Sequence, residues 1–212
     1  MFSDTRQSRD LVHIGGPLDP DILPARRLQA RMYADLGFTD DVTVLDLASG
    51  TLSDPWLPDS LHFALARDGE AIGHARLISP GERGLPSDQF VTTAAPMRSS
   101  TVEVSALVTA RGFGSAFGLA KQLYRAMYHH SMDIGIHNWI AIVEEPLHRI
   151  LARVFKFPCE VIGPEHTYFG VVKPLLLHLP TVTKALSAET DNYFLEGANP
   201  ESVARTLQSC RS

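Results

Sequence analysis

The sequence predicts an α/β or α+β domain in which a central mixed, mostly antiparallel sheet carries helices on both faces. Alternating apolar residues mark two strands at 61–67 and 71–78, and the Asp68-Gly69 pair between them is typical of a tight hairpin turn. A third alternating run, residues 102–108, leads through a glycine-rich turn into a segment of helical period. Extended and helical patterns then alternate, which predicts a sheet that begins antiparallel and becomes mixed.

Composition fits one domain with a proper core, because the 212 residues are 44% hydrophobic. The net charge of −5 argues against nucleic acid as the partner of the whole molecule. No apolar run approaches the roughly 20 residues of a membrane helix, and the polar N-terminus has no signal-peptide pattern. Cys159 and Cys210 have neither disulfide-framework nor zinc spacing. We expect a cytoplasmic protein, by elimination, with no membrane span and no metal.

Three segments are expected along the chain. Residues 1–20 are polar and predict a leader that is at best partly ordered. Residues 21–180 form the predicted domain. Residues 181–212 form a C-terminal extension, packed on the domain or trailing from it, in which Pro200 opens a predicted helix.

The first half of the domain begins with a helix over 21–36, where Asp21 is the expected cap and Gly37 the expected C-terminal stop. Val42–Leu45 predicts a short strand, and 46–60 a long loop. The predicted hairpin follows. Residues 79–100, rich in proline and glycine, predict a second loop.

The central stretch is residues 102–120. Its strand alternation puts Val102, Val104, Ala106 and Val108 on one face and Glu103, Ser105 and Leu107 on the other. A glycine-rich turn, 111–116, precedes a helix predicted over 118–132. A strand, a glycine turn and a helix start bring backbone N–H groups together around an anion. An ordinary strand-to-helix turn has the same pattern.

The second half predicts a short buried strand at Trp139–Val143 and a helix that begins at Pro146. This helix turns Leu151 and its apolar neighbours inward. Thr167–Val172 predicts the next strand, with 175–179 continuing in an extended or helical form.

Four stretches in this order resemble the GNAT acyltransferase fold. Within it they resemble the branch of acyl-homoserine-lactone autoinducer synthases and long-chain N-acyl amino acid synthases. The stretches are Arg27–Phe38 as the opening helix, Gly73-His-Ala-Arg-Leu-Ile78, Val102-Glu-Val-Ser105, and Leu151–Phe157 with Ile162-Gly163-Pro164 and Tyr168-Phe-Gly170. Together they span about residues 25–178.

The resemblance implies a single GNAT-like domain that moves a fatty acyl group from an acyl-carrier-protein or coenzyme A thioester to an amine. The co-substrate is then an acyl-phosphopantetheine thioester. Arg111-x-x-Gly114-x-Ala116 fits the family's cofactor loop. Its small residues let the backbone approach a phosphate. The residues expected to hold the pantetheine arm are Leu107, Val108, Arg111, Gly112, Phe113, Gly114, Ser115 and Ala116.

In this reading Glu103 removes a proton from the amine, with Ser105 beside it as the second catalytic residue. A backbone N–H near Leu107–Val108 holds the oxyanion where two strands splay apart. Arg76, His74 and Trp56 are the expected substrate contacts. The alternatives are structural: Glu103 as a paired carboxylate, Arg76 in a salt bridge with Glu103 or Asp46, Ser105 as a strand hydroxyl, and Trp56 as a core plug.

Departures from the lactone synthases bear on the acceptor. Ala106 stands where the Glu-x-Ser strand of those enzymes continues with arginine, and Gln29 stands where the opening helix has one. The acidic Glu-x-Asp-x-Tyr-Asp stretch is absent. These polar groups are expected to hold the methionine-derived substrate, so the N-acyl amino acid synthase type fits better. Ala152 occupies the slot of the tyrosine that protonates the leaving thiolate in many GNAT enzymes.

A basic helix face predicts a partner. Lys121, Arg125, Arg149, Arg153 and Lys156 would steer an acidic acyl carrier protein toward the site, although such faces are commonly only solvated. Two further functions stay open: a catalytically inactive acyl-ligand-binding protein of this fold, and a short-chain N-acetyltransferase that uses acetyl-coenzyme A.

Overall fold

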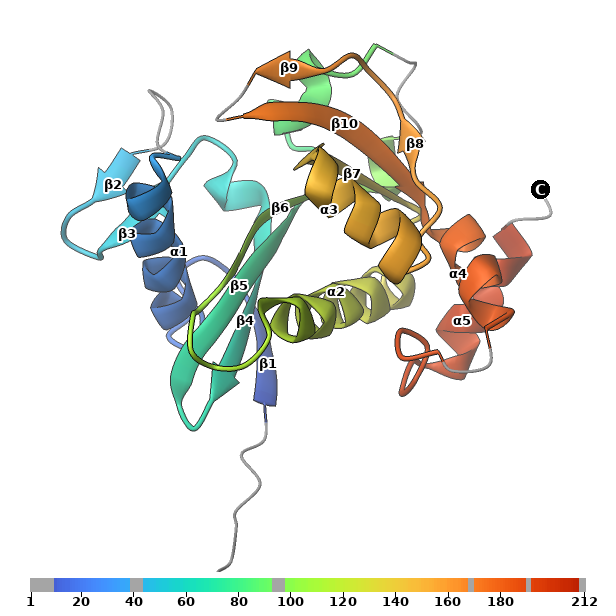
Figure 1. Ribbon diagram of the computed structural model, residues 1–212, viewed down its shortest axis with the longest axis horizontal. Coiled ribbons are helices and arrows are strands. Elements are labelled where there is room, and N and C mark those ends of the chain that lie inside the picture. The colour runs from blue at the N-terminus through green and yellow to red at the C-terminus, as the bar shows by residue number, and fades with distance from the viewer. Residues whose placement is uncertain (1–9, 39–43, 93–97, 168–169, 190–191, 210–212) are drawn as a thin grey trace, which may run out of the picture.

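The computed structural model describes residues 10–38, 44–92, 98–167, 170–189 and 192–209. Its main sheet has eight strands in the order β1-β4-β5-β6-β7-β10-β8, with β9 paired to β10 (Figure 1). The strands are β1 Asp10–Gly15, β4 Ser60–Arg67, β5 Glu70–Ile78, β6 Thr101–Thr109, β7 Asn138–Glu144, β8 Glu160–Val161, β9 His166–Thr167 and β10 Val171–His178. The β6–β7 pairing is parallel and the other described pairings are antiparallel, which confirms the predicted mixed sheet.

The predicted hairpin is β4–β5, and its turn explains the Asp-Gly signal. Asp68 has φ 51° and Gly69 has φ 82°, so both central residues are left-handed, as a hairpin turn of the primed type requires. Gly73 in β5 lies against helix α2, where an added Cβ would meet a Leu123 methyl carbon at 3.1 Å. This close approach fixes the distance between helix and sheet.

Strand β1 is a correction to the predicted boundaries. Residues 10–15 pair with β4 from Asp10↔Arg67 to Gly15↔His62. They belong to the sheet, so the expected leader over 1–20 is wrong for this segment. Residues 1–9 of that leader lie outside the described residues. The strand itself contains Leu11, Val12 and Ile14, and it was overlooked because polar residues precede it and Gly15-Gly16-Pro17 ends it.

The helices cover both faces, as predicted. They are α1 Leu23–Leu36, α2 Ala116–Asp133, α3 Glu145–Arg149, α4 Leu179–Ser187 and α5 Pro200–Gln208; α3 continues as a π-helical turn, Ile150–Val154. Gly37 ends α1 in the left-handed conformation, as expected. Asp21 does not cap that helix: Ile22 holds the cap position with no side-chain bond, so this expectation was wrong.

Irregular segments hold more structure than predicted. The expected loop 46–60 contains strand β3 Thr51–Ser53, which pairs with β2 Val44–Asp46 in a separate two-stranded sheet. Residues 42–43 of the predicted strand lie outside the described residues. Short 3-10 turns occupy Leu57–Asp59, Pro86–Gln89 and Arg98–Ser100. Residues 175–179 are extended as far as His178, and α4 begins at the next residue.

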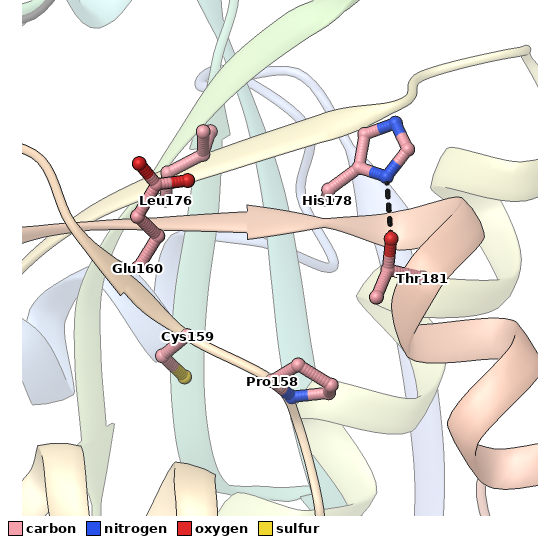
Figure 2. Close-up of a pocket in the computed structure, with 6 residues that line it drawn as sticks. All are labelled: Pro158, Cys159, Glu160, Leu176, His178 and Thr181. Carbon is pink, nitrogen blue, oxygen red and sulfur yellow. Dashed lines mark hydrogen bonds between the residues drawn. The ribbon is translucent and has the colours of Figure 1, made fainter. Parts of the chain in front are cut away.

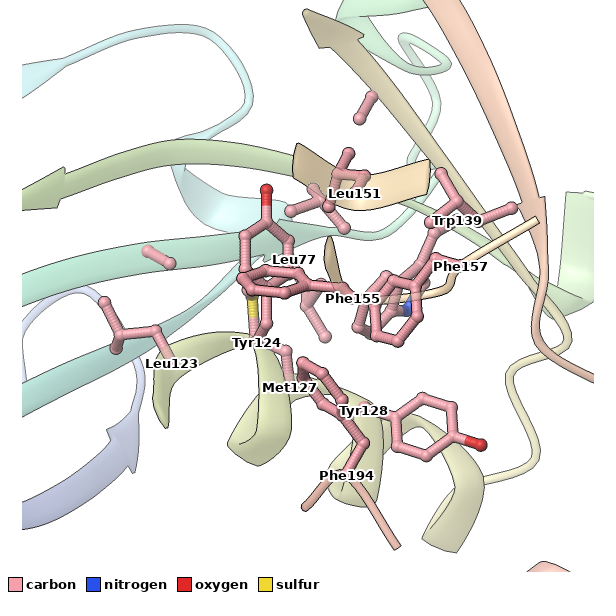
Figure 3. Packing of buried hydrophobic residues seen from close by; sticks show 14 of the residues in the cluster. Leu77, Leu123, Tyr124, Met127, Tyr128, Trp139, Leu151, Phe155, Phe157 and Phe194 are labelled. Atoms are coloured by element: carbon pink, nitrogen blue, oxygen red, sulfur yellow. The ribbon is translucent and has the colours of Figure 1, made fainter. Parts of the chain in front are cut away.

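The larger core lies on the face that α2 covers. Its buried side chains come from alternate positions of the central strands, from α2 and α4, and from residues 151–157 behind α3; they include Phe63, Leu123, Met127, Trp139 and Phe157. Figure 3 shows how closely the aromatic rings of this cluster pack. Tyr128 and Trp139, for example, meet edge to face at a centroid distance of 6.3 Å.

The C-terminal extension packs on this core within its described part. Phe194 is 3% exposed and lies 4.7 Å, ring to ring, from Phe157. The predicted terminal helix is α5, and Cys210 lies outside the described residues. None of the described helices is long and apolar enough to cross a membrane.

Candidate active site

Glu103 lies near the middle of the sheet, on the face opposite the large core. It is 4% exposed and accepts a hydrogen bond from the Ser87 amide at 2.7 Å. Burial raises the pKa of this carboxyl to about 7, against the lowering effects of Ser87 and of the Arg76 charge. A carboxyl with a pKa near neutrality is suited to take and release a proton at physiological pH.

Arg76 occupies the same face on β5, where it pairs in register with Ser105. Its Nη1 lies 2.7 Å from Asp54 Oδ2, and both side chains are about one-tenth exposed. The salt bridge foreseen with Glu103 or Asp46 is therefore made with Asp54 instead. Arg76 Nε is buried and has no hydrogen-bond partner in the described part of the chain. One guanidinium donor thus remains free beside Glu103.

His74 and His62 form a buried pair next to this ion pair. His62 Nδ1 lies 2.9 Å from His74 Nε2, and His74 Nδ1 lies 3.3 Å from the Ala106 carbonyl oxygen. Burial lowers the pKa of both rings, to about 3 for His62. His74 has no exposed surface, so the expectation that it contacts substrate is not met by this geometry.

A β-bulge interrupts β6 beside His74. The β5–β6 register passes from Arg76↔Ser105 to His74↔Val108, so Ala106 and Leu107 together oppose one residue. Ala106 has φ 56°, in the left-handed region. The bulge shifts the alternation, and Leu107 packs against the large core rather than sharing a face with Glu103 as predicted.

Strands β6 and β7 diverge at the same place. Their described pairing runs from Thr101↔Asn138 to Glu103↔Ile140, while β7 continues to Glu144 beside β10. In Figure 1, β4, β5 and β6 run to one side of the molecule, and β7 and β10 to the other. The carboxylate of Glu103 therefore lies where the two halves of the sheet part.

The glycine loop follows β6 and fits an anion-binding cradle. Gly112 and Gly114 have φ 90° and 114°, and an added Cβ at either position would meet no atom within 4 Å. Ser115 caps α2 by accepting a bond from the Gly118 amide. Backbone N–H groups at the start of this 18-residue helix favour a phosphate.

The residues predicted to hold the pantetheine arm differ in exposure. Arg111, Gly112, Gly114, Ser115 and Ala116 are exposed, whereas Phe113 and Leu107 are half-buried against the core and Val108 is buried. From Glu103 to Thr109, where β6 ends, the strand spans roughly 20 Å. Only a long, extended ligand would reach both ends.

Three residues that the sequence reasoning missed tether this loop. Arg67 donates to the Phe113 carbonyl oxygen at 2.8 Å and to both Asp10 oxygens at 2.6 and 2.9 Å. Gln122 of α2 also donates to Asp10, at 2.9 Å. Asp10 was hidden in the supposed leader, and Arg67 was assigned only to the end of a predicted strand.

An apolar patch adjoins Glu103 on its own face. Ile78, Leu85, Ile140 and Ile162 are buried together, and the half-buried Trp56 packs against them. Trp56 therefore contributes to packing, which agrees with the alternative that it is a core residue, and it also lies on the Glu103 face.

The basic face is partly engaged within the chain. Lys121 Nζ and the Arg125 guanidinium lie 4.2 and 4.3 Å from the centre of the Tyr193 ring. Arg125 also lies 3.7 Å from Glu196, and Arg149 donates to Glu145 at 2.8 Å. Arg153 and Lys156 are exposed.

A shallow pocket of about 200 Å³ lies elsewhere, between β8, β10 and α4 (Figure 2). Cys159 lines it, and burial raises the pKa of this thiol to about 11, so it is a poor nucleophile. The His178 ring bonds to Thr181 at 2.8 Å. None of the predicted site residues lines this pocket. Within the described ranges, no group of three His, Cys, Asp or Glu side chains could hold a metal ion.

Comparisons with known proteins identify the family and the fold. The family model for the N-acyl amino acid synthase FeeM matches residues 24–180. The solved structure of FeeM, an N-acyl amino acid synthase from uncultured soil microbes, is 17% identical, covers 84% of this chain and 95% of its own, and has a TM-score of 0.59. None of the curated proteins matches this chain in sequence.

Two acyl-homoserine-lactone synthases have the same fold. LasI is 18% identical with a TM-score of 0.68, over 81% of this chain and 91% of its own. BjaI, a coenzyme A-dependent enzyme solved with SAM and isopentyl-CoA, is 16% identical with a TM-score of 0.67, over 94% of this chain and 100% of its own. The predicted GNAT-like fold and the resemblance to this group are confirmed.

Proposed function

The chain belongs to the FeeM family of N-acyl amino acid synthases, and on that premise we propose that it transfers a fatty acyl group from a phosphopantetheine thioester to the amine of an amino acid. The observation that carries the proposal is Glu103, a buried carboxyl with a pKa of about 7 at the divergence of β6 and β7. The donor is an acyl carrier protein or coenzyme A thioester.

Glu103 is the proposed general base. Its carboxylate takes a proton from the acceptor ammonium, directly or through a water, and the free amine attacks the thioester carbonyl carbon. A C–N bond forms, the C–S bond breaks, and the thiolate leaves on the pantetheine arm. The nitrogen loses two protons in all: Glu103 takes one before the attack, and the second leaves as the tetrahedral intermediate collapses to the amide. The thiolate takes up one of these protons, and the other passes to solvent, which returns Glu103 to the carboxylate. Ser105, half-buried on the same face, is the proposed polar neighbour of the reacting amine.

The bulge supplies the proposed oxyanion donor. The Leu107 N–H belongs to the peptide that follows the left-handed Ala106, beyond the last β6–β7 pair described. Preorganised N–H groups at this kind of position stabilise the charge that develops on the carbonyl oxygen. The exposed N–H groups of 112–116, with Arg111, are proposed to hold the phosphate end of the arm.

Arg76 is the proposed contact for the acceptor. Its Nε has no partner among the described residues and lies on the same face as Glu103. A guanidinium with a free donor suits the carboxylate of an amino acid. Trp56 and the apolar patch beside it are proposed to border the reacting groups.

The test is a product assay with purified protein. Acyl carrier protein and coenzyme A thioesters of several chain lengths are offered with a mixture of amino acids, and products are identified by mass spectrometry. We expect an N-acyl amino acid from the wild type and at least a hundredfold less from Glu103→Gln, in keeping with the value of a general base.

Glu103→Gln removes the proton acceptor with little change in structure, because the Gln side-chain oxygen can still accept from the Ser87 amide. Thioester binding without product in the wild type would contradict the proposal and indicate a ligand-binding protein. Product formed from acetyl-coenzyme A alone would indicate a short-chain N-acetyltransferase. Equal turnover by wild type and Glu103→Gln would remove Glu103 from the mechanism.

A further inference from the structure

The hydrogen bonds of the buried histidine pair determine which nitrogen of each ring carries a proton. A carbonyl oxygen only accepts, so the ring nitrogen that faces Ala106 O, His74 Nδ1, carries the proton. The His74 ring is neutral, so its Nε2 has a lone pair and accepts from His62 Nδ1–H. His62 Nε2 is then left without a proton, and this buried atom has no partner in the described part of the chain. Both rings therefore carry their proton on Nδ1.

The surroundings keep the pair neutral. Both rings are at most 1% exposed, and the Arg76 and Arg26 guanidinium groups add positive charge nearby. Burial is the main reason that the pKa of each ring lies well below its usual value. A protonated His74 ring would lose the Nε2 lone pair that accepts from His62. The pair thus has one stable arrangement rather than two.

The chain of bonds ends at the strained peptide of the bulge. An alanine in the left-handed region costs roughly 1–2 kcal/mol, so its conformation needs support from its surroundings. The His74 bond supplies that support at the Ala106 carbonyl oxygen. Because a trans peptide places C=O and N–H on opposite sides, the Leu107 N–H points away from His74.

We propose that His74 and His62 are positioning residues that hold the Ala106–Leu107 peptide turned, so that the Leu107 N–H faces the thioester carbonyl oxygen of the acyl donor. This inference rests on the proposed function. His74 acts on the peptide directly. His62 acts through His74, because its Nδ1–H makes His74 Nε2 the acceptor and so fixes the useful tautomer. Neither ring contacts substrate.

The first test is independent of turnover. Nitrogen-15 NMR of the histidine rings distinguishes a protonated from an unprotonated ring nitrogen. We expect Nδ1 to carry the proton in both His62 and His74. A proton on His74 Nε2 would overturn the inference, because the bond to Ala106 would then be absent.

The second test uses His74→Asn and His74→Leu. The Asn side-chain amide places a donor close to the position of Nδ1, whereas Leu provides none. For His74→Leu we expect kcat to fall about 10- to 100-fold, since a misdirected oxyanion donor loses part of the roughly 100- to 1000-fold that such a donor supplies. The KM for the donor should stay the same. His74→Asn should recover most of the lost rate.

The double variant isolates His62. His62→Leu should lower kcat in the wild-type background but not in the His74→Asn background, where no tautomer has to be fixed. Equal losses in both backgrounds would mean that His62 is only a packing residue. An unchanged kcat in folded His74→Leu would remove the positioning role of His74 while leaving the proposed function intact.

A binding measurement separates this inference from the proposed function. Addition of an acyl-pantetheine thioester should shift the Leu107 amide resonance in the wild type and in His74→Asn, but much less in His74→Leu. Shifts at 112–116 without one at Leu107 would contradict the inference. If no resonance in the protein shifts, both the inference and the proposed donor are wrong.

Discussion

The two faces of the central sheet differ sharply although the same strands build both. On β4, Phe63 and Leu65 enter the apolar core beneath α2, while His62, which precedes Phe63, lies on the opposite face, in register with Arg76. On β6, Val104 joins the same core, while Glu103 faces the opposite way. The α2 face is buried mainly by apolar side chains and aromatic rings, whereas the opposite face also buries charges and ring nitrogens.

The difference indicates that the apolar face stabilises the fold and that the polar face serves a functional site. Burial of apolar side chains stabilises the fold, at about 25 cal/mol for each Å² removed from water. Burial of Glu103 and the histidine pair raises the energy of their charged forms instead. The polar face is therefore maintained at a cost to stability, and a cost of this kind is characteristic of a functional site.

The largest expected effect is a loss of stability when a side chain of the apolar core is removed. Phe157→Ala removes a fully buried ring that contacts Tyr128, Phe155 and Phe194. We expect unfolding to become easier by about 3–5 kcal/mol, measured by urea denaturation at pH 7. The transfer rate of the molecules that remain folded should change little. A selective loss of rate with unchanged stability would contradict the division between the two faces.

On the polar face, we expect a substitution at Glu103 to raise stability rather than lower it. Glu103 has a folded pKa of about 7 against 4.5 ordinarily, so the folded protein holds an extra proton between these values. The contribution of Glu103 to the free energy of unfolding is fully present below pH 4.5 and is lost as pH rises through about 7. Glu103→Gln should thus be more stable than the wild type by about 3 kcal/mol at pH 8 and equal to it near pH 4.

Denaturation at these two pH values checks this prediction, with Ser105→Ala as a matched variant on the same face that removes no charge. A Glu103→Gln protein less stable than the wild type at pH 8 would show that the carboxylate is a stabilising structural group.

A smaller effect is expected from the ion pair. Asp54→Asn removes the charge that faces Arg76 at 2.7 Å and should reduce stability by about 2 kcal/mol. The uncompensated Arg76 charge should also lower the pKa of Glu103, because Arg76 already acts in that direction. The acidic limb of the pH–rate profile should therefore move to lower pH. A limb that stays in place would mean that Arg76 and Glu103 are not coupled.

The smallest expected effect concerns the surface. Arg153→Glu with Lys156→Glu should slow turnover with an acyl carrier protein several-fold at low salt and leave coenzyme A turnover unchanged, as charge steering predicts. Lys121→Glu with Arg125→Glu is the matched pair on cations that Tyr193 already engages. If this second pair has the larger effect on carrier turnover alone, the carrier binds over α2 instead.

The sequence predicted the elements that local patterns specify. The hairpin, the central strand with its glycine loop, and Gly37 at the end of α1 follow from turn chemistry and alternation. The patterns also placed Glu103 on the other face of the strand from Val102 and Val104. What they missed depends on contacts between distant residues: the Asp10–Arg67 tether joins positions 57 apart, and the Arg76–Asp54 pair crosses from a loop to a strand.

The bulge was missed for another reason. Alternation continues through Ala106 in the sequence, and alanine gives no sign of a left-handed conformation. Only the pairing with β5 and the His74 bond reveal that the chain turns there. Leu107 was assigned to the wrong face as a result.

The pH dependence of acyl transfer in the wild type and in Glu103→Gln tests the central claim most directly. With the acceptor saturating, kcat/KM for the thioester donor should rise with pH through a value near 7, where the Glu103 carboxyl loses its proton. In Glu103→Gln the rate should be at least a hundredfold lower, and this limb should be absent. The same limb at the same pH in both proteins would show that Glu103 is not the base.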